Sequence, residues 1–341
     1  MRSCRFVIPA VLAVLTSFLT TLPSLAQQSS PYRPVATYSI VARDSLTGQM
    51  GVAVQSHWFS VGPIVPWARA GVGAVATQSF VEPAYGPLGL ELMATGRSAS
   101  DAMKALISTD DGEAVRQVAM VDAEGRVSAH TGSRAIIAAG HQMGAQYSVQ
   151  ANMMEHDTVW PAMAAAYESA EGDLANRLLA ALDAAQEEGG DIRGKQSAAI
   201  LIVPGEASNT PWNDVIFNLR IEDHPTPLVE LRRLVTLQRA YNAMNAGDGF
   251  MTTGNVEAAL EQYDFAMTLL PDEATNGEAA FWVGVTLVEA GDETGAVPYL
   301  RRAYQQDARW AELLTRLPAS ELLKDDDALV ARLLRGMKAS D

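Results

Sequence analysis

The sequence predicts a mixed α+β domain built as a four-layer αββα sandwich, followed by a small all-helical tail. Runs of alternating apolar and polar residues come in blocks, and each block is followed by segments with helical spacing. Loops of hairpin length connect neighbouring strand runs, and such loops cannot connect parallel strands. These observations favour two antiparallel sheets with helices on both outer faces over a doubly wound parallel sheet. A change in sequence character near residue 246 predicts the separate tail.

The first block begins with a predicted hairpin. Its two strand runs alternate between apolar and polar residues, and the stretch 44–48 between them has turn composition. A third strand follows a loop that contains Pro63 and Pro66, and two helical segments come next. The elements expected here are strands at 38–42, 50–56 and 71–79 and helices at 85–96 and 99–108.

The second block repeats this order. Its hairpin turns at Glu124 and Gly125, and its helix pair stops at Gly189 and Gly190, because glycine commonly ends a helix. The elements expected here are strands at 115–121, 126–131, 147–153, 197–203 and 214–221 and helices at 157–169, 173–188 and 228–245. We therefore expect one large domain over residues 37–245.

The tail, residues 246–341, contains an internal repeat. Small and aromatic or apolar residues recur 37 positions apart: Gly254, Ala259, Tyr263 and Ala266 correspond to Gly291, Ala296, Leu300 and Ala303. Small residues at matched helical positions let paired helices approach closely. The pattern resembles the tetratricopeptide repeat, with Pro271 closing the first copy, although the usual period is about 34 residues. An ordinary helical extension that shares these small residues is the alternative.

The N-terminus has the features of a secretory signal peptide. Arg2 and Arg5 precede an apolar stretch at 6–19, and small residues stand at 24–26, which predicts cleavage after Ala26. We therefore expect a signal peptide at 1–26, a leader at 27–36, and a secreted or periplasmic protein. The apolar stretch is shorter than the roughly 20 residues of a membrane span. An uncleaved membrane anchor is the alternative.

Composition excludes several classes of partner and site. The single cysteine, Cys4, lies in the predicted signal peptide, so the mature chain has no thiol for a disulfide, a zinc site or a nucleophile. Removing Arg2 and Arg5 with the signal peptide moves the formal net charge from −15 to −17. This charge repels nucleic acids and anionic lipid surfaces, so neither nucleic acid nor a membrane is an expected partner.

Motifs for nucleotide, metal and serine chemistry are weak. The glycines at 71–76 lie in a strand-like run rather than between a strand and a helix, and residues 189–195 lack the serine or threonine of a phosphate-binding loop. The five histidines have no i, i+4 spacing, and no G-x-S-x-G motif occurs. We therefore expect no metal and no organic cofactor.

Six stretches of the chain together carry a family resemblance. They are TYSIVARD at 37–44, GVAVQS at 51–56, VPWARAGVGAVATQ at 65–78, YGPLGL at 85–90, AHTG at 129–132 and GGDIRGKQSAAILI at 189–202. Together they resemble the family called domain of unknown function 1028, whose members have a fold like that of N-terminal-nucleophile (Ntn) hydrolases. The resemblance covers roughly residues 37 to 235, and it implies a fold and a mechanistic class but no substrate.

The resemblance implies that Thr37 is the nucleophile. In Ntn hydrolases the nucleophile is the first residue of the mature chain, and its α-amino group, with a pKa near 7.7 to 8.0, serves as the general base. Signal cleavage after Ala26 leaves residues 27–36 in front of Thr37, where its nitrogen is an amide that cannot accept a proton. This mechanism therefore requires a second cut between Ala36 and Thr37. The alternative is that Thr37 is only a strand residue.

Further residues are assigned to the same site. Ser39 shares a strand face with Thr37 and is expected to orient it; Arg69 is expected to stabilise the nucleophile or hold a carboxylate, and Asn152 to donate to an oxyanion. The expected substrate-binding residues are His57, Gln78, Asp191 and Arg193. A solvated arginine, a strand-ending asparagine and a surface histidine are the alternatives for Arg69, Asn152 and His57.

Two functions are consistent with these features. The first is hydrolysis of an amide bond in a small molecule through an acyl-threonine intermediate. The second is a non-catalytic secreted binding or scaffold protein, in which the core holds a ligand and the tail contacts a protein partner. The uncut leader favours the second function, and N-terminal sequencing of the mature protein distinguishes them.

Overall fold

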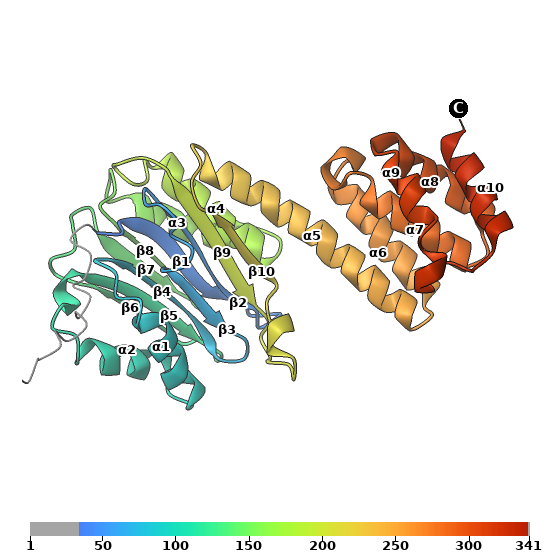
Figure 1. Cartoon of the computed structure of the whole chain (residues 1–341). Helices are drawn as coiled ribbons and strands as arrows, with labels where there is room; N and C mark the ends of the chain where they lie inside the picture. Colours follow the sequence, from blue (N-terminus) through green and yellow to red (C-terminus); the bar gives the residue numbers. More distant parts are fainter. Residues whose placement is uncertain (1–33, 340–341) are drawn as a thin grey trace, which may run out of the picture.

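The computed structural model describes residues 34–339 as a mixed α/β body followed by a helical region (Figure 1). The predicted signal peptide at 1–26 and most of the leader lie outside the described residues. Within residues 34–339, ten α-helices and two antiparallel sheets are present. No helix in this range is long and apolar enough to cross a membrane.

The larger sheet has six strands in the order β10-β9-β2-β1-β8-β7. Their bounds are β1 Thr37–Arg43, β2 Met50–Ser56, β7 Gly140–Gly144, β8 Tyr147–Asn152, β9 Ser197–Val203 and β10 Phe217–Ile221. The predicted first hairpin is present as β1 and β2, and every neighbouring pair is antiparallel. β1 lies near the centre of this sheet, so its backbone is hydrogen-bonded on both edges.

The smaller sheet has four strands in the order β3-β4-β5-β6. Their bounds are β3 Pro66–Arg69, β4 Gly73–Ser79, β5 Arg116–Asp122 and β6 Val127–Thr131. Valines and alanines from the facing sides of the two sheets form a shared apolar core, which includes Val41, Val52, Ala76 and Ala119. The two sheets therefore stack face to face.

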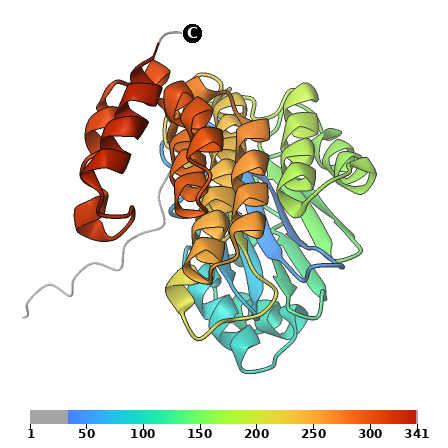
Figure 2. The same cartoon turned by 90° about the vertical axis from the view of Figure 1, so that its right-hand side faces the viewer.

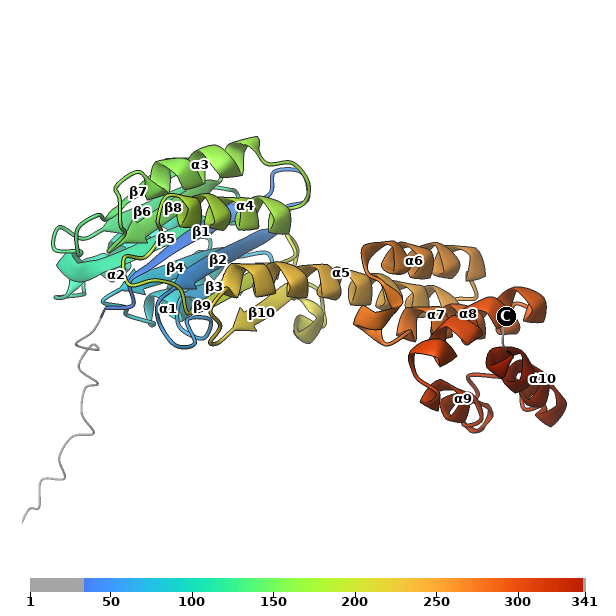
Figure 3. The same ribbon diagram turned by 90° about the horizontal axis from the view of Figure 1, so that it is seen from above.

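Helix pairs cover the outer side of each sheet. Helices α3 Val159–Ser169 and α4 Leu174–Glu187 pack on the six-stranded sheet through a core that includes Tyr38, Met163 and Leu178 (Figure 3). Helices α1 Tyr85–Ala94 and α2 Ala99–Ile107 pack on the four-stranded sheet beside Val75, Val118 and Met120 (Figure 1). Alternation along the strands produces this arrangement, because one face of each sheet meets helices and the other meets the second sheet.

Two strands were not predicted from the sequence. β3 begins at Pro66, in a stretch interpreted as a loop, and β7, with the sequence GHQMG, has no apolar alternation. Both are edge strands. An edge strand tolerates proline and needs little apolar sequence, because one of its backbone edges and part of its surface face solvent.

The predicted boundary at residue 246 falls inside one continuous helix. Helix α5, Pro227–Thr252, begins against the six-stranded sheet through Leu228, Leu231 and Val235 and continues into the helical region. The predicted helix end at residue 245 is therefore wrong by about two turns. The helix continues past residue 245 because Gly247 lies against Tyr263 of the next helix and Met251 packs on the same separate core as Ala243 and Met244.

The tail consists of helix pairs at the far end of α5 (Figure 2). Its helices are α6 Val256–Leu269, α7 Glu278–Glu289, α8 Glu293–Gln306, α9 Arg309–Leu314 and α10 Asp327–Lys338. The 37-residue repeat appears directly, since α8 has the bounds of α6 displaced by that period. Ala259, Tyr263 and Ala266, and their counterparts in α8, are all buried.

Candidate functional site

Thr37 lies at the start of β1, between β2 and β8. Its backbone is opposite Ser56 on one side and Asn152 on the other. Strand alternation directs Thr37 and Ser39 toward the four-stranded sheet, whereas Tyr38 lies among the residues that face α3 and α4. The Thr37 side chain is fully buried.

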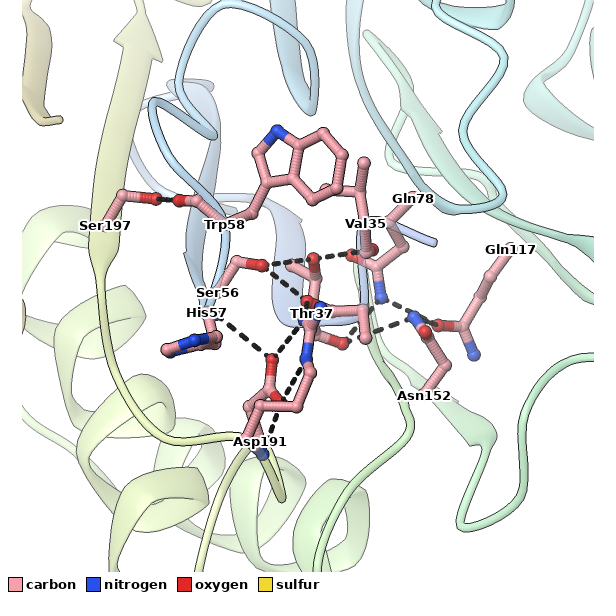
Figure 4. Close-up of polar contacts among 12 residues, drawn as sticks. Val35, Thr37, Ser56, His57, Trp58, Gln78, Gln117, Asn152, Asp191 and Ser197 are labelled. Carbon is pink, nitrogen blue, oxygen red and sulfur yellow. Dashed lines mark hydrogen bonds and ion pairs between the residues drawn. The ribbon is translucent and has the colours of Figure 1, made fainter. Parts of the chain in front are cut away.

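The hydroxyl groups of Thr37 and Ser56 lie side by side at the start of β1 (Figure 4). Thr37 Oγ1 donates to the Val35 carbonyl at 2.8 Å and lies 3.2 Å from Ser56 Oγ. Ser56 Oγ in turn donates to the Ala36 carbonyl at 2.5 Å. The Thr37 hydroxyl and a hydroxyl that donates to the Ala36 carbonyl are thus hydrogen-bonded to each other beside the Ala36–Thr37 bond.

Arg193 supplies a second donor to the same carbonyl. Its Nη2 donates to Ala36 O at 3.0 Å and to Asp191 Oδ2 at 2.8 Å. Asp191 is almost fully buried and also accepts the backbone N–H of His57 at 3.1 Å. Because the carboxylate holds the guanidinium from the other side, the donor that points at Ala36 is fixed in place.

The loop that carries Arg193 depends on glycine. Gly190 and Gly194 have φ values of +66° and +109°, a region that L side chains rarely adopt. A Cβ on Gly190 would approach Tyr38 and Gln186 to 3.2 and 3.1 Å. These two glycines therefore let the loop turn closely over the end of β1.

Residues 34–36 cross from one sheet to the other and cover Thr37. Val35 exchanges two backbone hydrogen bonds with Ser79 at the end of β4, at 2.7 and 3.0 Å, and the chain then enters β1. Ser79 has a φ of +70°, which costs a residue with a side chain roughly 1–3 kcal/mol. The end of the leader is thus held in the structure as a bridge between the sheets.

A network of buried amides holds the other side of Thr37. Gln78 Nε2 donates to Thr37 O at 3.2 Å and to Gln117 Oε1 at 2.7 Å, while Ser39 Oγ donates to Gln78 Oε1 at 2.6 Å. Asn152 Nδ2 also donates to Thr37 O, at 3.4 Å, and to Gln117 Oε1 at 2.9 Å. Fully connected buried networks of this kind restrict the position of the backbone they bind.

Most of the predicted site residues lie in this one region. Ser39 contacts Thr37 through Gln78. Arg193 reaches the carbonyl of the peptide bond before Thr37, Asp191 holds Arg193, and His57 is bonded to Asp191 through its backbone N–H. His57 and Arg193 also line an open pocket of ≈ 640 Å³ with Trp58, Phe59 and Gln196. Gln78 and Asp191 are buried behind this pocket rather than in it.

Arg69 lies apart from the cluster. It ends β3 opposite Gly73, at the other end of β4 from Ser79, and forms an exposed ion pair with Glu91. At about 3.3 Å per residue, Gly73 and Ser79 are roughly 20 Å apart. The expected contact between Arg69 and Thr37 is therefore not formed, because β3 runs away from the start of β1.

Asn152 is beside Thr37, but its amide protons are engaged by Gln117 and by the Thr37 carbonyl. The donors at the Ala36 carbonyl are Ser56, which sequence reasoning missed, and Arg193. The predicted hairpin could have identified Ser56, because a turn at 44–49 places residue 56 opposite residue 37.

The protonation of Tyr38 and the grouping of possible metal ligands further describe this region. Burial, followed by the negative charges of Asp191 and Asp183, raises the pKa of Tyr38 well above its usual value, so this phenol remains protonated. In the part of the chain that the structure describes, no three histidine, cysteine or carboxylate residues are grouped as metal ligands. With Ser56 and Arg193 donating to the Ala36 carbonyl, the arrangement can support nucleophilic attack by a hydroxyl.

Comparisons with known proteins place this region in one sequence family. A family model described as "Family of unknown function (DUF1028)" matches residues 37–231. A crystal structure of a Silicibacter pomeroyi protein, described with the same family model, has 31% sequence identity and a TM-score of 0.52. The match covers 58% of this chain and 87% of that chain. No curated protein matches the chain.

Proposed function

The chain belongs to the DUF1028 family, whose function is unknown. From the geometry of the site we propose that the protein is an Ntn-type hydrolase that cleaves an amide bond of a small molecule through Thr37. The stacking of two antiparallel sheets between helix pairs supports assignment to the four-layer Ntn-hydrolase-like fold. The position of Thr37 at the start of a central strand agrees with that class.

One observation carries the proposal, namely the two donors that converge on the Ala36 carbonyl beside the Thr37 hydroxyl. Ser56 Oγ and Arg193 Nη2 lie 2.5 and 3.0 Å from this oxygen. Donors fixed at a carbonyl oxygen stabilise the negative charge that develops there when a nucleophile adds to the carbon. A peptide bond held in this way is prepared for attack by the adjacent hydroxyl.

The first reaction is cleavage of the chain before Thr37. Thr37 Oγ1 adds to the Ala36 carbonyl carbon, the C–N bond breaks, and the hydroxyl proton ends on the released nitrogen. Water then hydrolyses the resulting ester, leaving a carboxylate on Ala36 and an α-amino group on Thr37. Residues up to Ala36 are released, and the buried hydroxyl becomes accessible.

The released α-amino group then serves as the general base for turnover, since its pKa near 7.7 to 8.0 leaves it partly neutral at neutral pH. A substrate amide carbonyl takes the place of the Ala36 carbonyl, between Ser56 and Arg193. Its acyl group lies in the pocket beside Trp58 and Phe59. Thr37 Oγ1 adds to the substrate carbonyl carbon and gives its proton to the α-amino group, which passes it to the amine that leaves as the C–N bond breaks. Water then hydrolyses the acyl ester, releasing the product acid and restoring the Thr37 hydroxyl.

The test is export of the full chain with its own N-terminal segment, followed by intact-mass measurement of the mature protein. We expect a chain that begins at Thr37 and hydrolyses aromatic acyl p-nitroanilides. Thr37→Val should abolish both the cut and the turnover. Its matched control, Thr109→Val, changes an exposed threonine and should leave both results unchanged. A fully active mature protein that begins at Gln27 would overturn the α-amino-base mechanism.

A non-catalytic binding protein is the second candidate, and two observations favour it. Thr37 is fully buried beneath residues 34–36, and the tail has cores of its own. In this function the tail is a tetratricopeptide-like module that contacts a protein partner, and the exported chain keeps its leader. A mature protein that begins at Gln27 and shows no amide turnover would support this function over hydrolysis.

A further inference from the structure

A second pocket lies on the other face of the six-stranded sheet from the Thr37 side chain, where β2 meets α4. Gln55 and Ser56 are neighbours on this strand, but Ser56 points to the Ala36 carbonyl and Gln55 pairs with Tyr38 on the face that meets α4. The pocket there has a volume of ≈ 270 Å³. It is lined by Gln55, by Asp183, Gln186 and Glu187 of α4, by Lys195, and by residues 226–229 at the start of α5.

Gln55 is the first sign that this pocket holds a ligand. Its side chain is fully buried, and its amide oxygen has no hydrogen-bond partner within residues 34–339. The Tyr38 hydroxyl donates to Gln186 Oε1 at 3.1 Å, so it can accept a hydrogen bond from the Gln55 amide N–H but gives the amide oxygen no donor. Burying a polar atom without a partner destabilises the folded protein, so this amide oxygen is expected to have a partner in the bound protein.

The start of α5 and Lys195 form the positive side of the pocket. Pro227 is at the first helical position and has no N–H, whereas the N–H groups of Leu228 and Val229 have no acceptor within the helix. The Thr226 side chain does not cap them. Lys195 is exposed and forms no ion pair in the described part of the chain. These donors suit a carboxylate.

The α4 side of the pocket is negative. Glu187 is exposed and unpaired within the described residues, whereas Asp183 is neutralised by Arg232. One carboxylate is therefore available for a cation, and it makes a multiply charged anion such as phosphate unfavourable. Pro227, Leu228 and Val229 add an apolar surface, of which Val229 is 69% exposed.

We propose that this pocket binds a free α-amino acid with an aliphatic side chain. The ligand carboxylate lies at Lys195 and the start of α5, and its ammonium group lies at Glu187. The side chain of the ligand packs on Leu228 and Val229, and the Gln55 amide oxygen accepts a second hydrogen bond from the ammonium group. None of the steps of the proposed amide hydrolysis uses this pocket, so the two proposals stand or fall separately.

The experiment is calorimetric titration of the full chain with L-leucine. We expect saturable binding, with at least a tenfold loss of affinity in Lys195→Met and in Glu187→Gln. Lys104→Met, a matched change on the exposed side of α2, should bind L-leucine as the wild type does. Thr37→Val should also bind normally, which separates this site from the hydrolytic one.

Two ligand analogues test the assignment of charges. 4-Methylpentanoate lacks the ammonium group and isoamylamine lacks the carboxylate, so each should bind at least tenfold more weakly than L-leucine. No binding of L-leucine at millimolar concentration would overturn the proposal. So would equal affinities of the Lys195→Met and Lys104→Met variants, or binding of either analogue as tight as that of L-leucine.

Discussion

Thr37→Val separates the chemistry of the hydroxyl from its structural role. Valine has nearly the shape of threonine and suits a strand, so the fold should remain while the nucleophile is lost. We expect the Ala36–Thr37 bond to stay intact in the variant and amide turnover to fall by orders of magnitude.

The stability cost follows from the hydrogen bonds that the hydroxyl makes. Thr37 Oγ1 donates to Val35 O at 2.8 Å, and that carbonyl keeps its bond from the Ser79 N–H at 3.0 Å. Ser56 Oγ keeps its bond to Ala36 O. Because no buried partner is left without a hydrogen bond, the loss should be about 1 kcal/mol in unfolding free energy. For a domain of this size that corresponds to roughly 2–4 °C in melting temperature.

The assay combines intact mass with thermal unfolding. Thr37→Ser, which keeps an oxygen nucleophile and loses one methyl group, should still be cut, and the mature chain should begin at residue 37. If Thr37→Val is cut at this bond as fast as the wild type, another protease makes the cut and the Thr37 hydroxyl is not the nucleophile. A loss of stability far above 1 kcal/mol would show that the hydroxyl is mainly structural.

Three further predictions test the arrangement around this site. Arg193→Met should slow cleavage before Thr37 by at least tenfold, because the Ala36 carbonyl loses the donor Nη2. Arg69→Met should leave the cleavage rate unchanged in time-resolved mass measurements, and equal rates in the two variants would contradict the donor role of Arg193. Truncation after residue 245 should leave a main domain that unfolds cooperatively by calorimetry, because the first turns of α5 pack on the six-stranded sheet. Aggregation of the truncated protein would show that the tail covers an apolar face of the main domain. Burial, and then the nearby His130, lower the pKa of His141 below 6.5, so the unfolded chain binds more protons than the folded one and stability should decrease as pH falls below about 6.5. In denaturant titrations His141→Gln should lessen the dependence of unfolding free energy on pH, and an unchanged dependence would refute the role of His141.

The sequence alone was sufficient for elements defined by local patterns. Alternation predicted β2 at its observed bounds, and the 37-residue spacing predicted two equivalent helices, now seen as α6 and α8. These patterns are informative because a buried strand or helix needs apolar residues at a fixed period. The same reasoning failed for β3 and β7, since edge strands have weaker demands on their sequence.

Tertiary structure decided which side chains meet. Ser56 and Arg193 are distant from Ala36 in sequence, and sheet pairing and one glycine-dependent loop bring them to its carbonyl. The sequence predicted Arg69 as a residue of the same site, but β3 runs away from the start of β1, so Arg69 lies at the opposite end of the sheet. Thr37 itself could be named from its position in the sequence, whereas its burial beneath residues 34–36 could not. A strand pattern specifies which face a residue occupies, but not what the rest of the chain places on that face.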